Sequence, residues 1–172
     1  AGELKSKPTQ HSVKELRAIG IQPDFLICRS ENPITAEVKS KIGLFCSVRP
    51  ENVINAPDAS TIYEVPLLLH KEGFDAKITN FLNLQTSPPK LSGWNAMVDT
   101  IKNPSNEVTI GLVGKYVGLT ESYKSLNEAL VHGGIANNTK VEIVYIDSEA
   151  LDINNLKNAL SHVDGILVPG GF

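Results

Sequence analysis

Lys5 and Lys7, near the amino terminus, are the residues whose type and spacing best suit binding chemistry. Pro8 disfavours a helical backbone at Lys7, and side chains two positions apart in an extended chain leave on the same face. The two ammonium groups are therefore expected to point together. Because ammonium groups form charge-assisted hydrogen bonds with phosphate, the segment predicts a site for a phosphorylated ligand.

A helix is expected to begin directly after this segment. Ser12 suits the N-cap, Glu15 completes a capping box, and Gly20 ends the apolar repeat. The free amides and the positive dipole end of such a helix favour a polyphosphate, and Thr9 and Gln10 offer neutral hydrogen-bonding groups to a base or a sugar. Two lysines on a solvated surface are the alternative.

Three more charged residues adjoin expected strands and helices. Arg29 follows the apolar run 25–28, expected to be a strand buried on both faces; at a strand's carboxyl end it either meets a phosphate or a base or pairs with surface carboxylates. Lys41 closes an expected helix over 35–42 and suits that helix's carboxyl end. Asp58 follows an expected strand over 50–55 and either accepts from a ribose or an adenine amine or bonds its own backbone.

Strands and helices alternate in the last third of the chain. Their short connections predict a parallel, doubly wound α/β unit. The expected order is a strand over 108–113, a helix from Thr120 to Gly133-Gly134, a strand over 141–146, a helix over 151–160 and a strand over 165–168.

Two glycine-containing segments of this unit resemble anion sites in composition. Pro169-Gly170-Gly171 follows the last strand, where glycine amides can face an oxyanion. Gly114-Lys115 is not a phosphate loop, because the upstream glycine at the required spacing is missing.

A polar, proline-containing stretch over 85–106 is expected to link two domains, residues 1–84 and 107–172. Ser87-Pro88-Pro89-Lys90 makes it stiff, and a short helix from Ser92 is expected to dock it. Trp94 in that helix fits either a packed core or a partner interface.

Composition is that of an ordinary soluble protein. The 172 residues are 41% apolar, and 16 basic against 19 acidic residues give a net charge of −3, so no general attraction to nucleic acid or anionic membrane is expected. Cys28 and Cys46 lie in apolar runs, which predicts buried thiols in the reducing cytoplasm. The abrupt ends suggest a piece of a longer polypeptide.

Motifs along nearly the whole chain resemble the CTP synthase family. The most specific is the run Lys5-Ser6-Lys7-Pro8-Thr9-Gln10, within a longer matching segment over 2–13. The others are Leu26-Ile27-Cys28-Arg29-Ser30, Ser60-Thr61-Ile62-Tyr63, Val113-Gly114-Lys115-Tyr116, Tyr145-Ile146-Asp147-Ser148 and Val168-Pro169-Gly170-Gly171-Phe172. The last of these is shared more loosely by class I glutamine amidotransferases.

The resemblance implies an α/β fold in two parts. The first is a portion of a P-loop-like (Rossmann-like) amidoligase or synthetase domain, and the second is the start of a flavodoxin-like class I glutamine amidotransferase domain. It also implies a ligase that aminates UTP to CTP with ATP, Mg²⁺ and ammonia from L-glutamine. The family further implies GTP as an allosteric activator, a homotetramer and possible filaments.

The resemblance also implies roles for individual residues. UTP and feedback CTP are assigned to Lys5, Ser6, Lys7, Pro8, Thr9, Gln10 and Lys41. ATP is assigned to Arg29, Asp58 and Ala59, and glutamine with its oxyanion to Gly170 and Gly171. Lys124, in the family's Tyr-Lys-Ser segment, has a possible coupling role between domains.

The family's catalytic and magnesium-binding residues have no counterparts in these 172 residues, so the segment alone is expected to be inactive. Two other functions stay open. One is a non-catalytic nucleotide-sensing or filament-forming module, and the other is a free-standing flavodoxin-like domain with a different ligand.

Overall fold

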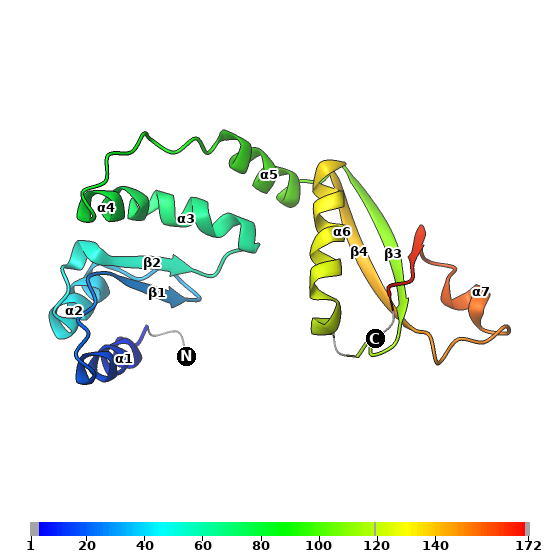
Figure 1. The fold of residues 1–172 in the computed structure, drawn as a ribbon, viewed down its shortest axis with the longest axis horizontal. Helices are drawn as coiled ribbons and strands as arrows, with labels where there is room; N and C mark the ends of the chain where they lie inside the picture. Colours follow the sequence, from blue (N-terminus) through cyan, green and yellow to red (C-terminus); the bar gives the residue numbers. More distant parts are fainter. Residues whose placement is uncertain (1–3, 119, 171–172) are drawn as a thin grey trace. The chain divides into compact units, whose positions relative to one another are not determined.

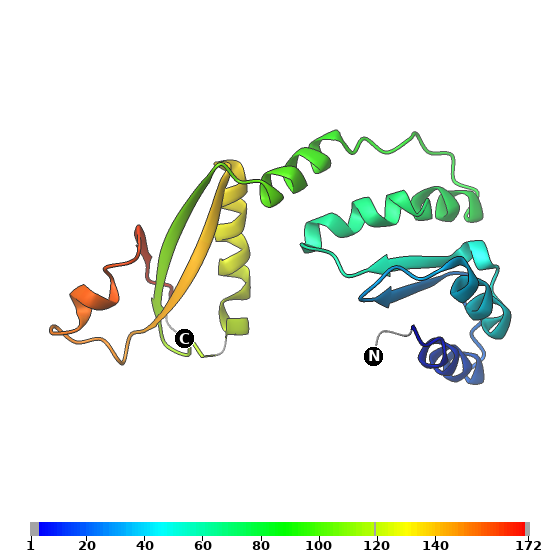
Figure 2. The same ribbon diagram turned by 180° about the vertical axis from the view of Figure 1, so that it is seen from behind.

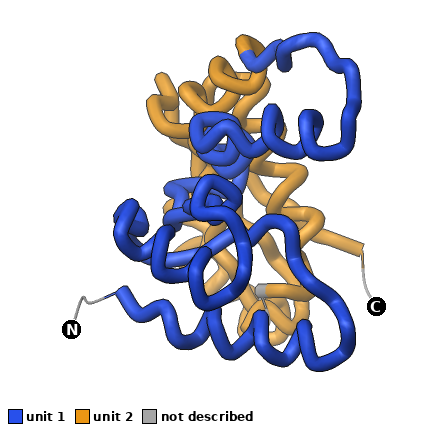
Figure 3. Tube along the Cα trace, turned by 90° about the vertical axis from the view of Figure 1, so that its left-hand side faces the viewer, with its two compact units in different colours: residues 1–91 blue, residues 92–172 orange. Residues whose placement is uncertain are grey.

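The computed structural model describes residues 4–118 and 120–170 and divides into two compact units, residues 1–91 and 92–172 (Figures 1 and 3). Each unit holds its own parallel sheet, which confirms the predicted α/β class. The division falls between Leu91 and Ser92. Of the helices in the described ranges, none combines the length and apolar character needed to cross a bilayer.

A two-stranded parallel sheet lies between helices in the first unit (Figures 1 and 2). Strand β1 (Leu26–Ser30) pairs with β2 (Val53–Pro57), and Cys28 stands opposite Asn55. The helices are α1 (Lys7–Ala18), α2 (Ala36–Cys46), α3 (Val65–Lys71) and α4 (Phe74–Phe81), with short turns η1 (Pro50–Asn52) and η2 (Ile62–Glu64). Helices α1 and α2 lie on one side of the sheet, and α3 and α4 lie on the other.

The core of this unit lies between α1, α2 and the sheet. It contains Val13, Cys28, Ile42, Cys46, Val48 and Val53. Both thiols are free and buried, as predicted. Burial raises the pKa of each thiol, which keeps them protonated and weakly reactive.

Helix α1 begins at Lys7, so the predicted start at Ser12 is wrong. Ser6 occupies the N-cap, and Pro8 is tolerated in the first turn because no intrahelical partner is needed for its missing N–H. Ser12 lies inside the helix and donates its hydroxyl to the Pro8 carbonyl at 3.1 Å. Lys5 and Lys7 therefore do not share an extended segment. The expectation that their side chains leave on the same face of an extended chain is wrong.

Strand β1 is not buried on both faces, which corrects a second expectation. Cys28 points into the core, whereas the Ile27 side of the strand is half exposed. That side borders a hollow between the sheet and α3 rather than packed protein. Helix α2 also continues past Lys41 to Cys46, so Lys41 lies within the helix and Cys46 does not belong to a strand.

A three-stranded parallel sheet in the order β4-β3-β5 organises the second unit (Figure 1). Its strands are β3 (Asn106–Gly114), β4 (Thr139–Asp147) and β5 (Gly165–Leu167). The helices are α5 (Ser92–Lys102), α6 (Lys124–Ala136) and α7 (Leu156–Ala159), with a turn η3 (Thr120–Tyr123). The alternation of parallel strands with helices was predicted from the sequence.

Two helix boundaries in this unit differ from expectation. Gly133-Gly134 does not end α6, which continues to Ala136. A Cβ on Gly134 would lie 2.5 Å from the Thr139 carbonyl, so glycine here permits close packing against β4. Helix α7 is only four residues long, because Asp152 Oδ1 accepts from the amides of Asn154 and Asn155 and holds the chain in a turn.

A glycine and a histidine–aspartate contact mark the connection between α3 and α4. Gly73, with φ of 70°, occupies the N-cap of α4, so the carboxylate of Asp75 does not cap this helix. Asp75 Oδ2 lies 2.7 Å from His70 Nδ1 instead, and this contact is the main cause of the lowered pKa of Asp75. His70 is exposed.

Candidate functional site

One depression of the first unit, the lysine pocket, is bordered by lysines from α1, from α2 and from the segment that precedes α1. Its volume is about 600 Å³, and it is lined by Leu4, Lys5, Ser6, Lys7, Thr35, Glu37, Val38 and Lys41. Four of the seven residues assigned to UTP and CTP thus lie together. Three ammonium groups against one carboxylate make the pocket suitable for an anion of high charge.

Two helix amino termini supply most of the pocket wall. Lys7 begins α1, and Thr35 caps α2 by accepting from the Val38 amide at 3.3 Å. The positive ends of both helix dipoles therefore add to the field of the lysines. The helix mouth expected after Ser12 is thus replaced by the first turns of α1 and α2.

Ser6 is buried at the N-cap of α1, where its hydroxyl accepts from Gln10 Nε2 at 3.0 Å. That bond uses one hydrogen of the Gln10 side-chain amide, and Gln10 borders a different depression along α1. Thr9 is hydrogen-bonded to the thiol of Cys28, and Pro8 is exposed. Pro8, Thr9 and Gln10 therefore support the first turn of α1, and nucleotide contact at these positions stays a prediction.

Glu37, Thr35 and Val38 are pocket residues that sequence reasoning missed. Glu37 and Lys41 are four positions apart on α2 and share a helix face. A carboxylate here repels phosphate and accepts hydrogen bonds from hydroxyl or amine groups. The threonine cap and the helical spacing were the available signals, but neither shows that the start of α2 lies beside the segment of Lys5 and Lys7.

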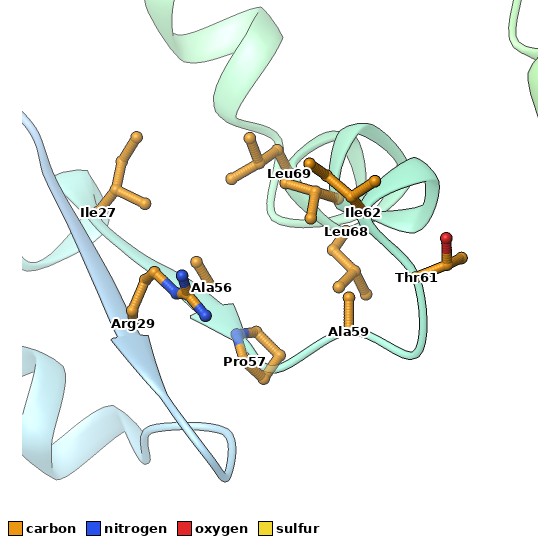
Figure 4. A pocket seen from close by; sticks show the side chains of 10 residues that line it. Ile27, Arg29, Ala56, Pro57, Ala59, Thr61, Ile62, Leu68 and Leu69 are labelled. Carbon is orange, nitrogen blue, oxygen red and sulfur yellow. The ribbon is translucent and has the colours of Figure 1, made fainter. Parts of the chain in front are cut away.

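A second depression, the apolar pocket, lies between the sheet and α3 (Figure 4). Its volume is about 410 Å³, and it is lined by Ile27, Arg29, Ala56, Pro57, Ala59, Thr61, Ile62, Val65, Leu68 and Leu69. Figure 4 shows side chains of β1 and β2 on one side and those of residues 62–69 on the other. An apolar slot with one guanidinium suits a flat, weakly polar ring.

Arg29 and Asp58 form an ion pair with Nη2 and Oδ1 3.0 Å apart. The Arg29 side chain is 81% exposed, and that of Asp58 is 55% exposed, so the pair contributes little to folding stability. The structure thus brings the three residues assigned to ATP to the carboxyl ends of β1 and β2. The surface pairing that was the alternative for Arg29 is present as well, and both groups remain accessible to a ligand.

A third depression lies at the carboxyl ends of β3 and β5 in the second unit. It is lined by Val113, Gly114, Lys115, Tyr116, Tyr123, Ser148, Val168, Pro169 and Gly170. Lys115 Nζ lies 3.1 Å from Glu149 Oε1, and the Tyr123 hydroxyl donates to the Lys115 carbonyl. Gly171, the second predicted glutamine contact, lies outside the described residues.

Lys124 begins α6, and its ammonium group lies 3.6 Å from Glu121 Oε2 on the surface. Among the residues that the structure describes, no three His, Cys, Asp or Glu side chains are grouped to hold a metal ion. Of the depressions in the described residues, the lysine pocket and the apolar pocket of the first unit gather residues assigned to nucleotides, and the depression in the second unit includes one residue assigned to glutamine, Gly170.

Comparison with known proteins matches both units of the chain. Residues 1–84 match the family model described as CTP synthase N-terminus. All 172 residues align with the CTP synthase of Bdellovibrio bacteriovorus at 62% identity, covering 32% of that protein. The whole chain also aligns with the CTP synthases of Desulfotalea psychrophila at 55% identity and Methanococcus maripaludis at 57%, covering 31% and 33% of those proteins.

The chain spans about a third of the length of these curated relatives. The alignment is not confined to the lysine segment, since it continues through the second unit. The chain therefore belongs to the CTP synthase family.

Proposed function

We propose that this chain is part of an enzyme that converts UTP to CTP. In that reaction O4 of UTP takes the γ-phosphoryl group of ATP and ADP leaves. Ammonia released from L-glutamine then attacks C4, and inorganic phosphate leaves. The chain contributes binding groups for these nucleotides, and by itself it is expected to be inactive.

The lysine pocket is the observation that carries the proposal. Lys5, Lys7 and Lys41 come from separate parts of the chain and meet in a pocket of about 600 Å³. We assign the triphosphate of UTP, and of CTP as feedback inhibitor, to these ammonium groups and the two helix termini. Ser6, Pro8, Thr9 and Gln10 complete the proposed nucleotide segment and hold its backbone at the start of α1.

The apolar pocket is the proposed site for the base of ATP. Arg29 stacks on the ring or meets its phosphates, and Asp58 accepts from the adenine amine or the ribose, with Ala59 beside it. Mg²⁺ is proposed to arrive with ATP. Since the described residues gather no metal-binding cluster, no step is assigned to a metal held by this chain.

The second unit is proposed to be the start of a flavodoxin-like class I glutamine amidotransferase domain, joined to the synthetase portion by residues 85–106. Its parallel β4-β3-β5 sheet supports this assignment. Gly170 and Gly171 are proposed to contact glutamine and the oxyanion formed during its hydrolysis. Lys124 at the start of α6 is proposed to take part in coupling between domains.

Further properties are proposed from family membership. These are assembly into a homotetramer, possible filaments and activation by GTP. The reducing cytoplasm is the proposed location, which is compatible with two buried, unpaired thiols.

A chimera tests the proposal. The 172 residues would replace the matching third of the Bdellovibrio bacteriovorus protein, to which they are 62% identical. The chimera is expected to form CTP from UTP, ATP and glutamine, whereas the isolated chain forms none. A folded chimera with intact ATP and glutamine binding that forms no CTP would contradict the proposal.

A further inference from the structure

Glu72 connects elements that form the walls of the lysine pocket and the apolar pocket. It caps the carboxyl end of α3, the helix that supplies Val65, Leu68 and Leu69 to the apolar pocket. Its carboxylate Oε2 accepts from Lys39 Nζ of α2 at 2.5 Å and from the Asn55 amide of β2 at 3.1 Å. One carboxylate therefore connects three elements.

Lys39 and Lys41 occupy opposite sides of α2, because residues two apart on a helix do not face each other. Lys41 lines the lysine pocket, while Lys39 is held by Glu72 on the other side. A second bond fixes the start of the same helix: the Ile34 amide donates to Oδ1 of the buried Asn55 at 3.2 Å. The pocket wall from Thr35 to Lys41 is thus anchored from behind at two points.

The Glu72 interaction is partly shielded from solvent. The side chains of Glu72 and Lys39 are 25% and 24% exposed, unlike the widely exposed Arg29–Asp58 pair. Burial alone would raise the pKa of Glu72. The hydrogen bonds from the Lys39 ammonium group and the Asn55 backbone amide, together with the charges of Lys39 and Lys77, outweigh burial and lower that pKa. The carboxylate is therefore ionised at neutral pH and holds both donors.

We propose that Glu72, through Lys39, is a positioning residue that fixes α2 so that Lys41 meets the terminal phosphates of the nucleotide. This inference rests on the proposed function of the lysine pocket. Glu72 does not line that pocket and acts only through the position of Lys41. Its substitution is therefore expected to weaken the binding of nucleotides with a long phosphate chain more than of those with a short one. A contribution to folding alone would weaken all nucleotides alike.

Calorimetric titration of the protein with UTP and UMP tests this role. Glu72→Gln removes the charge and keeps an acceptor for Asn55, and Lys39→Met removes the ammonium group and keeps the side-chain stem. Both are expected to weaken UTP roughly tenfold, in the range of indirect coupling effects, and UMP much less. Lys71→Met, which removes an exposed neighbouring lysine, is the matched control and should bind both as the wild type does.

Two conservative variants complete the test. Lys39→Arg keeps the cation and should restore UTP affinity to within about twofold of wild type. Glu72→Asp keeps the charge but is one methylene shorter, so it should lose UTP affinity even where Glu72→Gln fails to fold.

The outcomes separate the two proposals. Wild-type UTP affinity in folded Glu72→Gln and Lys39→Met, or equal losses for UTP and UMP, would overturn the positioning role while UTP binding by the wild type still stands. If the wild-type protein does not bind UTP, the assignment of the lysine pocket fails first, and the positioning role fails with it.

Discussion

At the scale of single residues, Lys7 has the most direct proposed role, which is contact with the triphosphate. Its type was predicted to matter, but its backbone was expected to be extended, and it instead begins α1. The convergence with Lys41 depends on the packing of α2 beside α1, which no local spacing reveals. The family resemblance identified the nucleotide-binding residues, and the tertiary structure shows that four of them lie in the lysine pocket.

Lys7→Ala is expected to reduce the increase in melting temperature that UTP or CTP produces. Loss of one charge-assisted hydrogen bond weakens binding by roughly ten- to a hundredfold, and ligand stabilisation falls with affinity. Lys14→Ala on the same helix is the control, since Lys14, unlike Lys7, does not line the lysine pocket. Circular dichroism should show unchanged helix content, and an unchanged nucleotide-induced shift in Lys7→Ala would place the triphosphate elsewhere.

At the scale of elements, glycines and carboxylates determine how helices meet strands. The sequence predicted that Gly133-Gly134 would end α6, because glycine is a common helix terminator. The structure uses Gly134 for close contact with β4 instead, and only the packed arrangement distinguishes the two roles. Likewise, Glu72 carried no signal in the sequence, since its partners are 17 and 33 residues away.

Gly134→Ala is expected to destabilise the protein, whereas Gly133→Ala is not. A methyl group on Gly134 would lie 2.5 Å from the Thr139 carbonyl and 2.8 Å from Val141, while nothing lies within 4 Å of one on Gly133. Overpacking costs about 1–3 kcal/mol, and alanine within a helix gains up to about 1 kcal/mol over glycine. Chemical denaturation measures both, and equal stabilities of the two variants would contradict the close α6–β4 contact.

Glu72→Gln is expected to lower stability at neutral pH and to make less difference in acid. The pKa of Glu72 is lowered in the folded protein, so its stabilising contribution is present above about pH 4.3, the usual value for glutamate, and is lost as the pH falls through the folded pKa. Urea unfolding of both proteins between pH 7 and pH 3 measures the difference. A constant difference across this range would show that the charge of Glu72 is not the stabilising feature.

At the scale of the whole molecule, two α/β units follow each other along the chain. Parallel strands and the polar stretch near residue 85 were predicted from apolar runs and prolines. The lack of packed protein over Ile27 was not, because a short apolar run reads as buried whether or not another layer covers it. The hollow beside Ile27 depends on how α3 lies over the sheet, which only the tertiary structure shows.

Limited trypsin digestion is expected to cut early after Lys90. Residues 82–90 are exposed and lie outside the helices and strands, so the backbone there can enter a protease without unfolding either unit. Mass spectrometry should identify fragments 1–90 and 91–172. Early cleavage within β1 or β3, with residues 82–90 left intact, would contradict the division into two stable units.

The central proposal is that a nucleotide triphosphate binds among Lys5, Lys7 and Lys41. A crystal structure of the protein with bound UTP is the most direct measurement of it. Phosphate density is expected within hydrogen-bonding distance of these ammonium groups and the first turn of α2. Triphosphate density at any other site, with the lysine pocket filled only by solvent, would contradict it.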